Sequence, residues 1–127
     1  VLDPGLTVFE QTERFNASHL AEHELKSILN RYLFPYETWD KPCFCLSGGE
    51  KIRLLFCCLM IGNNAPDVFI LDEPTNNLDI QSVEIITAAI KSYRGTVLLI
   101  SHDHYFVKEI KINRSIKLFD TGSVIKI

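Results

Sequence analysis

Two adjacent carboxylates at the end of a short apolar run are the strongest candidates for chemistry. Val68-Phe69-Ile70-Leu71 leads directly into Asp72 and Glu73. Ligands of open α/β sheets bind beyond the carboxyl ends of strands, and neighbouring carboxylates repel unless a cation or a proton transfer uses them. We therefore predict that Asp72 holds Mg²⁺, directly or through water, and that Glu73 is a general base for an attacking water. The alternative is a pair of solvent-facing turn carboxylates.

A second candidate site is the glycine pair in Ser47-Gly48-Gly49-Glu50. Ser47 and Glu50 have the spacing of a capping box, so the simplest interpretation is a well-capped helix start. The two glycines add a backbone that an incoming group can approach closely. A helix N-terminus carries free N–H groups and positive potential. The segment is therefore also predicted to bind a phosphate.

Two further segments follow apolar runs and could join these sites. Asn76-Asn77-Leu78-Asp79 predicts a turn in which Asn77 or Asp79 caps the next helix. Ser101-His102-Asp103 follows the apolar run Thr96 to Ile100. If the two runs are neighbouring strands, His102 lies beside Glu73 and could hydrogen-bond a terminal phosphate and the attacking water.

Composition sets the class of protein. The 127 residues are 46% apolar and 23% charged, which supports a packed core and argues against disorder. A net charge of −3 excludes a general electrostatic attraction to nucleic acid or anionic membranes, although not a local basic patch. The longest apolar run, Leu54 to Ile61, has eight residues, and a transmembrane helix needs about 20.

The cysteines and the chain start indicate the compartment. Cys43, Cys45, Cys57 and Cys58 lack the spacing of a zinc knuckle, so we predict buried reduced thiols and a cytoplasmic protein. No secretory leader is visible. The start at Val1 without methionine predicts a longer natural protein.

The elements that must position these residues change in type along the chain. Helices are predicted from Thr7, along the face formed by Ala21 to Leu33, and from Ser47 to Ile61, with an ordered loop over residues 35–45. Buried strands are predicted at 68–71 and 96–100, helices at 80–93 and 102–111, and a hairpin around residues 120–122. The expected fold class is α/β with a parallel sheet, divided into a helical subdomain (1–62) and part of a sheet core (63–127).

The four segments, in this order, resemble the ATP-binding cassette (ABC) ATPases. LSGGE is similar to their signature motif, FILDEP to Walker B, NNLD to the D-loop and SHD to the switch histidine. The resemblance implies ATP and Mg²⁺ as ligands and the C-terminal part of a P-loop NTPase-type core. It implies that Ser47, Gly48, Gly49 and Glu50 meet a nucleotide held by an opposing cassette. Asp72 would serve the metal, Glu73 the water and His102 the γ-phosphate, while Asp79 communicates across the interface.

Within that family the sequence resembles the ABC-F branch, and the resemblance lies mainly in the segments LSGGEKIR, DEPTNNLD and SHDHYF. That branch usually carries two tandem cassettes and acts on the ribosome, in translation or antibiotic resistance. The resemblance implies a second cassette and a ribosome as partners.

Two family features do not appear in these residues. The sequence contains no GxxxxGKS or GxxxxGKT, the phosphate-cradling P-loop. The Q-loop glutamine is also not found, because Gln11 follows a capped helix start and no strand. We therefore expect a fragment that hydrolyses no ATP alone and that leaves apolar sheet faces uncovered.

Three alternatives share parts of this pattern. One is the ATP-binding subunit of a membrane transporter. Another is the lobe of an SMC- or Rad50-like DNA-repair ATPase, although residues 1–42 show no sustained heptads. The third is a non-catalytic interaction module that keeps the fold without turnover.

Overall fold

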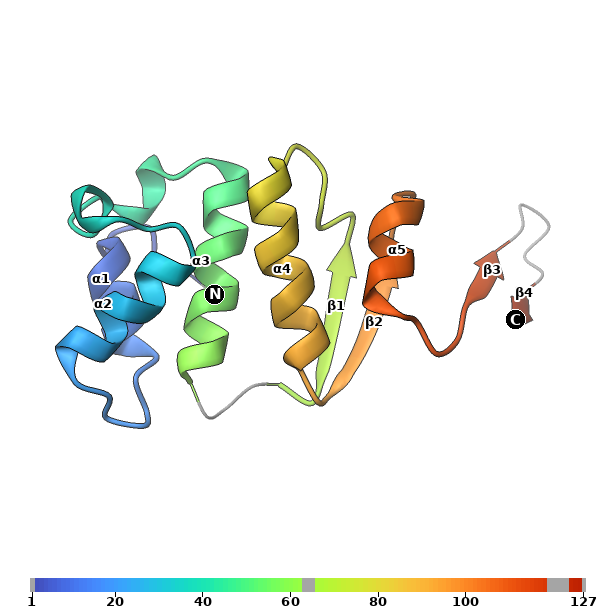
Figure 1. The fold of residues 1–127 in the computed structure, drawn as a ribbon, viewed down its shortest axis with the longest axis horizontal. Helices are drawn as coiled ribbons and strands as arrows, with labels where there is room; N and C mark the ends of the chain where they lie inside the picture. Colours follow the sequence, from blue (N-terminus) through green and yellow to red (C-terminus); the bar gives the residue numbers. More distant parts are fainter. Residues whose placement is uncertain (1, 63–65, 119–123, 127) are drawn as a thin grey trace.

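The structure, a computed structural model, describes residues 2–62, 66–118 and 124–126. Its first part is helical and its second part alternates strands with helices, which confirms the predicted α/β class (Figure 1). In chain order the elements are α1 (Val8–Arg14), α2 (Glu22–Arg31), two 3₁₀ turns (Tyr36–Thr38 and Cys43–Cys45), α3 (Gly48–Ile61), β1 (Val68–Asp72), α4 (Ile80–Ser92), β2 (Thr96–Ile100), α5 (His104–Ile110), β3 (Ile116–Leu118) and β4 (Val124–Lys126).

Both predicted capping boxes are present and fix where two helices begin. The Glu10 N–H donates to Thr7 Oγ1 at 3.2 Å, and the Thr7 N–H donates to Glu10 Oε2 at 2.8 Å. Ser47 and Glu50 repeat this exchange at 3.2 and 2.8 Å ahead of α3. Each pair satisfies two backbone donors that the first helical turn leaves without partners.

The segment between α2 and α3 differs from the prediction in two respects. Helix α2 ends at Arg31, two residues before the end of the predicted face, because Leu33 adopts a left-handed backbone with φ of 63°. Residues 35–45, predicted as a loop, contain the two 3₁₀ turns. The indole N–H of Trp39 donates to Phe34 O at 2.8 Å and holds this segment to the end of α2.

The central sheet consists of β1 and β2, which pair in parallel with Asp72 opposite Ile100 at the carboxyl end. Strands β3 and β4 form a separate antiparallel pair, with Ile116 opposite Lys126. The predicted hairpin residues 120–122 between them lie outside the described residues.

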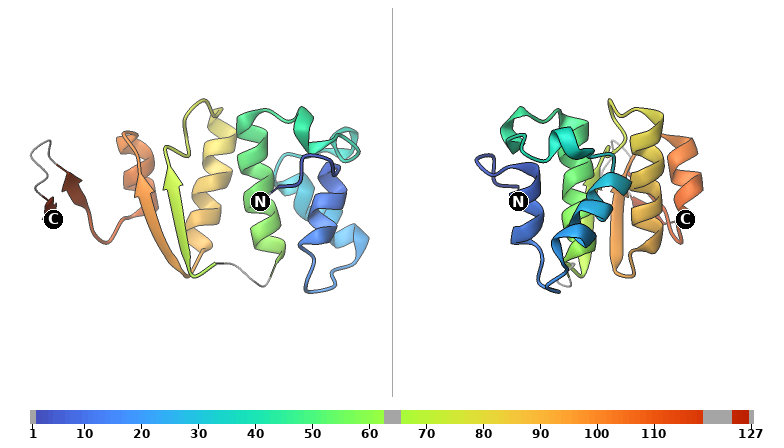
Figure 2. Two further views of the ribbon diagram at one scale, coloured as in Figure 1. Left: turned by 180° about the vertical axis from the view of Figure 1, so that it is seen from behind. Right: turned by 60° about the vertical axis from the view of Figure 1, so that its left-hand side comes forward.

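Helices α3, α4 and α5 cover one face of the central sheet, and Figure 2 shows its other face from behind. On the covered face, Leu71, Val97 and Leu99 pack against a core of Phe56, Ile86, Ala89, Ile90 and Phe106. On the other face, Val68, Ile70, Leu98 and Ile100 are about half exposed or more. The strands are therefore buried on one face only, because apolar side chains alternate to both sides and the described elements cover one of them. The exposed face agrees with the expectation that this chain leaves apolar sheet faces uncovered.

A second core joins α1, α2 and α3 in the N-terminal part. Its fully buried members include Val8, Leu25, Leu29, Phe34 and Leu54. Helix α3 contributes to both cores, since Leu54 lies in this one and Phe56 in the other. The predicted subdomain boundary at residue 62 stays a prediction.

The thiols provide a direct test of this packing. Cys43, Cys57 and Cys58 are buried and Cys45 is exposed, and all four are free. Burial raises the pKa of Cys58 to about 12 and the pKa of Cys57 well above its usual value. We expect rapid alkylation of Cys45 alone in the native protein, since thiolates are the reactive form. Peptide mass spectrometry after brief iodoacetamide treatment would check this, and rapid labelling of Cys57 would contradict it.

Candidate functional site

Three segments that carry the predicted site residues meet along one edge of the fold. The start of α3, the loop from β1 to α4 and the start of α5 all lie along the upper edge in Figure 1. Parallel pairing of β1 with β2 produces part of this arrangement, because the carboxyl ends of parallel strands lie at the same edge. The condition for placing His102 beside Glu73, that the two apolar runs are neighbouring strands, is met.

Glu73 occupies a strained position directly after β1. Its φ is 46°, a left-handed conformation that non-glycine residues rarely adopt. Its N–H donates to Ile100 O at 2.8 Å, which extends the pairing of β1 with β2 by one residue. The surrounding pairing thus holds a costly backbone geometry, a feature that clusters at functional sites.

The Glu73 carboxylate faces His102, two residues beyond the end of β2. Its Oε1 lies 3.6 Å from His102 Nε2, and its Oε2 accepts the His102 N–H at 3.4 Å. The Glu73 side chain is 22% exposed and the His102 side chain 98% exposed. The largely shielded Glu73 carboxylate can accept a proton. The accessible His102 imidazole beside it can contact an incoming phosphate.

A partly buried hydrogen bond between the two loops was not predicted from the sequence. Thr75 Oγ1 donates to Asp103 Oδ2 at 3.2 Å, and Thr75 is 9% exposed. Asp103 also caps α5, since its Oδ1 accepts the Phe106 N–H at 3.0 Å. The serine-histidine-aspartate segment had indicated a phosphate contact only, yet Asp103 holds the loop of Glu73 against the loop of His102.

Asp72 ends β1 with an exposed side chain. A single accessible carboxylate fits Mg²⁺, which proteins usually hold through one or two carboxylates, phosphate oxygens and several waters. Within the described ranges, no three His, Cys, Asp or Glu residues come together as a complete metal site.

At the start of α3, predicted to bind a phosphate, the two glycines have different surroundings. Gly48 and Gly49 occupy the first two helical positions, whose N–H groups have no acceptor within the helix. A Cβ at Gly48 would meet no heavy atom within 4 Å, so this residue lies open to an incoming group. A Cβ at Gly49 would lie 2.6 Å from Leu78 Cδ2. A side chain at position 49 would therefore displace the end of Leu78, whereas one at position 48 would meet no neighbour.

Glu50 is engaged in capping. Its Oε2 accepts the Ser47 N–H at 2.8 Å and lies 3.6 Å from Lys41 Nζ. Burial acts to raise the pKa of this carboxyl, but the hydrogen bond from Ser47 and the charge of Lys41 together leave the pKa below its usual value. The carboxylate therefore stays charged at neutral pH, and a nucleotide contact through Glu50 stays a prediction.

Asp79 is the N-cap of α4, one of the two caps predicted. Its Oδ1 accepts the Ser82 N–H at 2.7 Å, and this bond lowers the pKa of Asp79. The carboxylate is exposed at the same edge as Gly49 and Leu78. Its predicted communication across a cassette interface remains a prediction.

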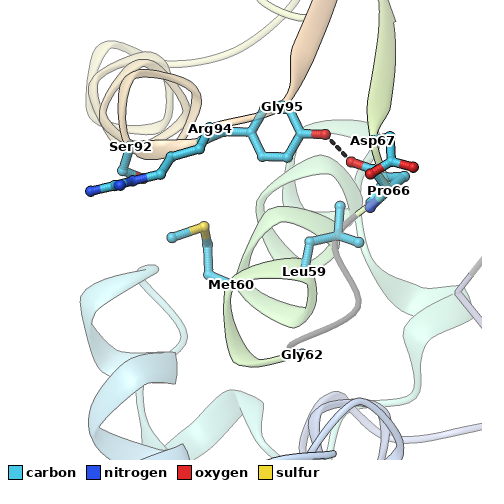
Figure 3. A pocket seen from close by; sticks show the side chains of 9 residues that line it. Leu59, Met60, Gly62, Pro66, Asp67, Ser92, Arg94 and Gly95 are labelled. Carbon is cyan, nitrogen blue, oxygen red and sulfur yellow. Dashed lines mark hydrogen bonds between the residues drawn. The ribbon is translucent and has the colours of Figure 1, made fainter.

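A pocket of about 440 Å³ lies elsewhere, at the amino ends of β1 and β2 (Figure 3). Asp67 and Arg94 are its charged residues, and the Tyr93 hydroxyl donates to Pro66 O beside it. This pocket does not contribute to the edge that carries Glu73 and His102.

Gln11, which was not assigned as the Q-loop glutamine, is fully buried in α1. Its Oε1 accepts the Asp3 N–H at 2.8 Å, so it also does not contribute to that edge.

Comparison with known proteins decides the family. A sequence profile described as "ABC transporter" matches residues 1–76. The chain belongs to the ABC family. The predicted resemblance to this family is thereby confirmed. Its F branch is confirmed as well, because relatives that are 46% and 43% identical to the chain are named as F family members.

Two relatives illustrate the match. ABC transporter F family member 2 of Arabidopsis thaliana is 46% identical over 78% of the chain, and the probable ATP-binding protein YbiT of Escherichia coli O157:H7 is 43% identical over 83%. The chain spans 14% and 19% of the length of these ABC relatives.

Solved structures confirm the fold at low sequence identity. An archaeal ribosome recycling factor, aABCE1, solved in complex with the ribosomal stalk protein aP1, matches 98% of the chain with a TM-score of 0.69 and 21% identity. The chain covers 25% of that factor. The dimeric bacterial ABC transporter cassette MJ0796 matches 85% with a TM-score of 0.63 and 22% identity, and the chain covers 51% of it. Both likenesses place the chain in the ABC cassette fold.

None of the helices in the described part of the chain combines the length and hydropathy required to span a bilayer.

Proposed function

We propose that this chain is the signature and Walker B part of a cassette that hydrolyses ATP. The contact of Glu73 with His102 at the carboxyl end of the sheet carries the proposal. The side-chain atoms are 3.6 Å apart, and the strained backbone of Glu73 is held by the bond from its N–H to Ile100 O. A proton acceptor and a phosphate-facing imidazole at the same edge suit attack of water on a terminal phosphate.

In the proposed reaction, Glu73 orients the attacking water and accepts its proton. His102 donates a hydrogen bond to the γ-phosphate and keeps it beside that water. Since phosphoryl transfer depends on positioning and charge stabilisation more than on covalent chemistry, fixed side chains suffice for this task. The bond from Thr75 to Asp103 supports the pair, because it ties together the loops that carry them.

Asp72 is the proposed holder of Mg²⁺. Its exposed carboxylate at the end of β1 stands one residue from Glu73. When bound, Mg²⁺ would neutralise the charge that develops on the phosphate oxygens. Asp72 would hold the metal ion beside the phosphates, and Glu73 would then remain free to act on the water.

The start of α3 would serve a second nucleotide. The Ser47 hydroxyl and the free N–H groups of Gly48 and Gly49 form an anion site with the positive end of the helix dipole. We propose that this site meets the γ-phosphate of ATP held by an opposing cassette, with Asp79 at the interface. That MJ0796 was solved as a dimer supports such an arrangement.

The proposal predicts different activities for the whole protein and for this chain alone. The whole protein should hydrolyse ATP only with Mg²⁺, as measured by phosphate release with and without chelator. The chain by itself contains no GxxxxGKS or GxxxxGKT and should neither bind Mg-ATP tightly nor hydrolyse it, as measured by calorimetric titration. Absence of turnover by the whole protein at saturating Mg-ATP would overturn the proposal, and micromolar binding to the chain alone would contradict the second part.

The proposed setting is the cytoplasm, with the ribosome as partner. The F-type relatives support it, as does the structural likeness to a factor solved with a ribosomal stalk protein. Co-sedimentation of the ATP-bound whole protein with ribosomes would test it. A transporter subunit is the second candidate, favoured by the likeness to the transporter cassette MJ0796. Retention of the protein by membranes, and not by ribosomes, would support that candidate instead.

A further inference from the structure

Leu78 lies directly against the start of α3. The space that a Cβ on Gly49 would occupy is 2.6 Å from Leu78 Cδ2 and 4.0 Å from Asn77 O. Leu78 also packs against the core cluster that contains Phe56 and Phe106. Its side chain therefore fills the gap between the helix start and the core beneath it, and the absence of a side chain at Gly49 leaves room for it.

The turn that carries Leu78 is fixed to Glu73 by consecutive hydrogen bonds. The Asn76 N–H donates to Glu73 O at 3.1 Å, and the Leu78 N–H donates to Thr75 O at 3.2 Å. Asn77 adopts a left-handed backbone with φ of 60°, which asparagine tolerates better than most residues. The position of Leu78 is thus determined by the same loop that holds the Glu73 carboxylate.

We propose that Leu78 is a positioning residue that sets the Ser47–Gly49 segment relative to Glu73. The inference rests on the proposed function, in which this segment meets one nucleotide and Glu73 serves the other. Leu78 would then connect the two nucleotide sites mechanically, because tightly packed side chains transmit displacement instead of absorbing it. Asp79, which caps α4 one residue later, keeps the far side of the turn in place.

The two glycines provide a matched pair for the test. A methyl group at Gly49 would push aside the Cδ2 end of Leu78, whereas a methyl group at Gly48 meets nothing within 4 Å. Any loss caused by Gly48→Ala must therefore arise where the nucleotide approaches the backbone. A loss caused by Gly49→Ala should arise in part from displacement of Leu78, and shortening Leu78 should relieve that part.

The experiment is a double-mutant cycle in the whole protein. Gly49→Ala is expected to lower kcat by about tenfold to a hundredfold, since a misplacement on the order of 1 Å has effects of this size. Leu78→Ala alone should lower kcat with little change in the KM for ATP. The double variant Gly49→Ala/Leu78→Ala should have a kcat at least about fivefold higher than additivity of the two losses predicts.

The same cycle with Gly48→Ala is the control, and there the losses should add. Additive losses for Gly49 and Leu78, or equal rescue of Gly48→Ala, would overturn the inference. Hydrogen exchange of residues 76–79 without nucleotide gives a second measurement. Exchange should accelerate in Gly49→Ala and return toward wild type in the double variant. Because this measurement needs no turnover, an inactive wild-type protein would overturn the proposed function separately.

Discussion

Replacing Glu73 with glutamine is expected to lower ATP turnover by the whole protein by about 10²–10⁴-fold, the usual contribution of a general base. Glutamine keeps the size of the side chain and removes its capacity to accept the proton of water. Binding of ATP should persist, because the groups proposed to hold the phosphates are unchanged. Steady-state phosphate release and nucleotide retention on a filter would measure the two effects separately.

Glu84 offers the matched control for this substitution. It is an exposed glutamate on α4 that is not among the residues proposed for the site. Glu84→Gln therefore removes the same charge without reaching the carboxyl end of the sheet, and its turnover should equal that of the wild type. Normal turnover in Glu73→Gln would remove Glu73 from its proposed role.

Replacing Phe106 with alanine is expected to destabilise the region of β2 and α5 by about 3–5 kcal/mol, the typical cost of removing a buried phenylalanine. Phe106 is fully buried in the core beneath the sheet, among Phe56, Ile86, Ala89 and Ile90. It also lies in the helix that Asp103 caps. Loss of this packing should loosen the loop that holds His102, so turnover should fall together with stability.

Hydrogen exchange of residues 96–110 in the whole protein would measure this effect. A loss of 3–5 kcal/mol corresponds to exchange that is faster by roughly 10²–10⁴-fold when opening is local. Tyr105→Ala is the control, because Tyr105 is the preceding residue and is 73% exposed. Its change should stay within about 0.5 kcal/mol, as is usual for surface substitutions. Equal exchange in the two variants would contradict the assignment of Phe106 to the core.

Local patterns in the sequence predicted most elements and the order of the site segments. The capping pairs at Thr7 and Ser47 placed two helix starts correctly, because a capping box is complete within four residues. Asp79 was predicted as a cap for the same reason. The end of α2 was missed, since the left-handed turn at Leu33 occurs at a residue type that gives no local signal for it.

Contacts between distant residues were decided by the tertiary structure. Pairing of β1 with β2 brought Glu73 within 3.6 Å of His102, a contact that the sequence predicted only on the condition that the strands are neighbours. The bond from Thr75 to Asp103 and the packing of Leu78 on Gly49 had no sequence signal. They depend on how helices and loops far apart in the chain are brought together.

The sequence by itself determined which residue types stand at the ends of which elements, and that was enough to identify the family. Capping, turn and strand patterns act over a few residues, so a single sequence contains them in full. Only the tertiary structure decided which sheet face is covered and that Leu78 lies against Gly49. Packing and burial depend on residues brought together across the fold, and no local pattern records which of them will meet.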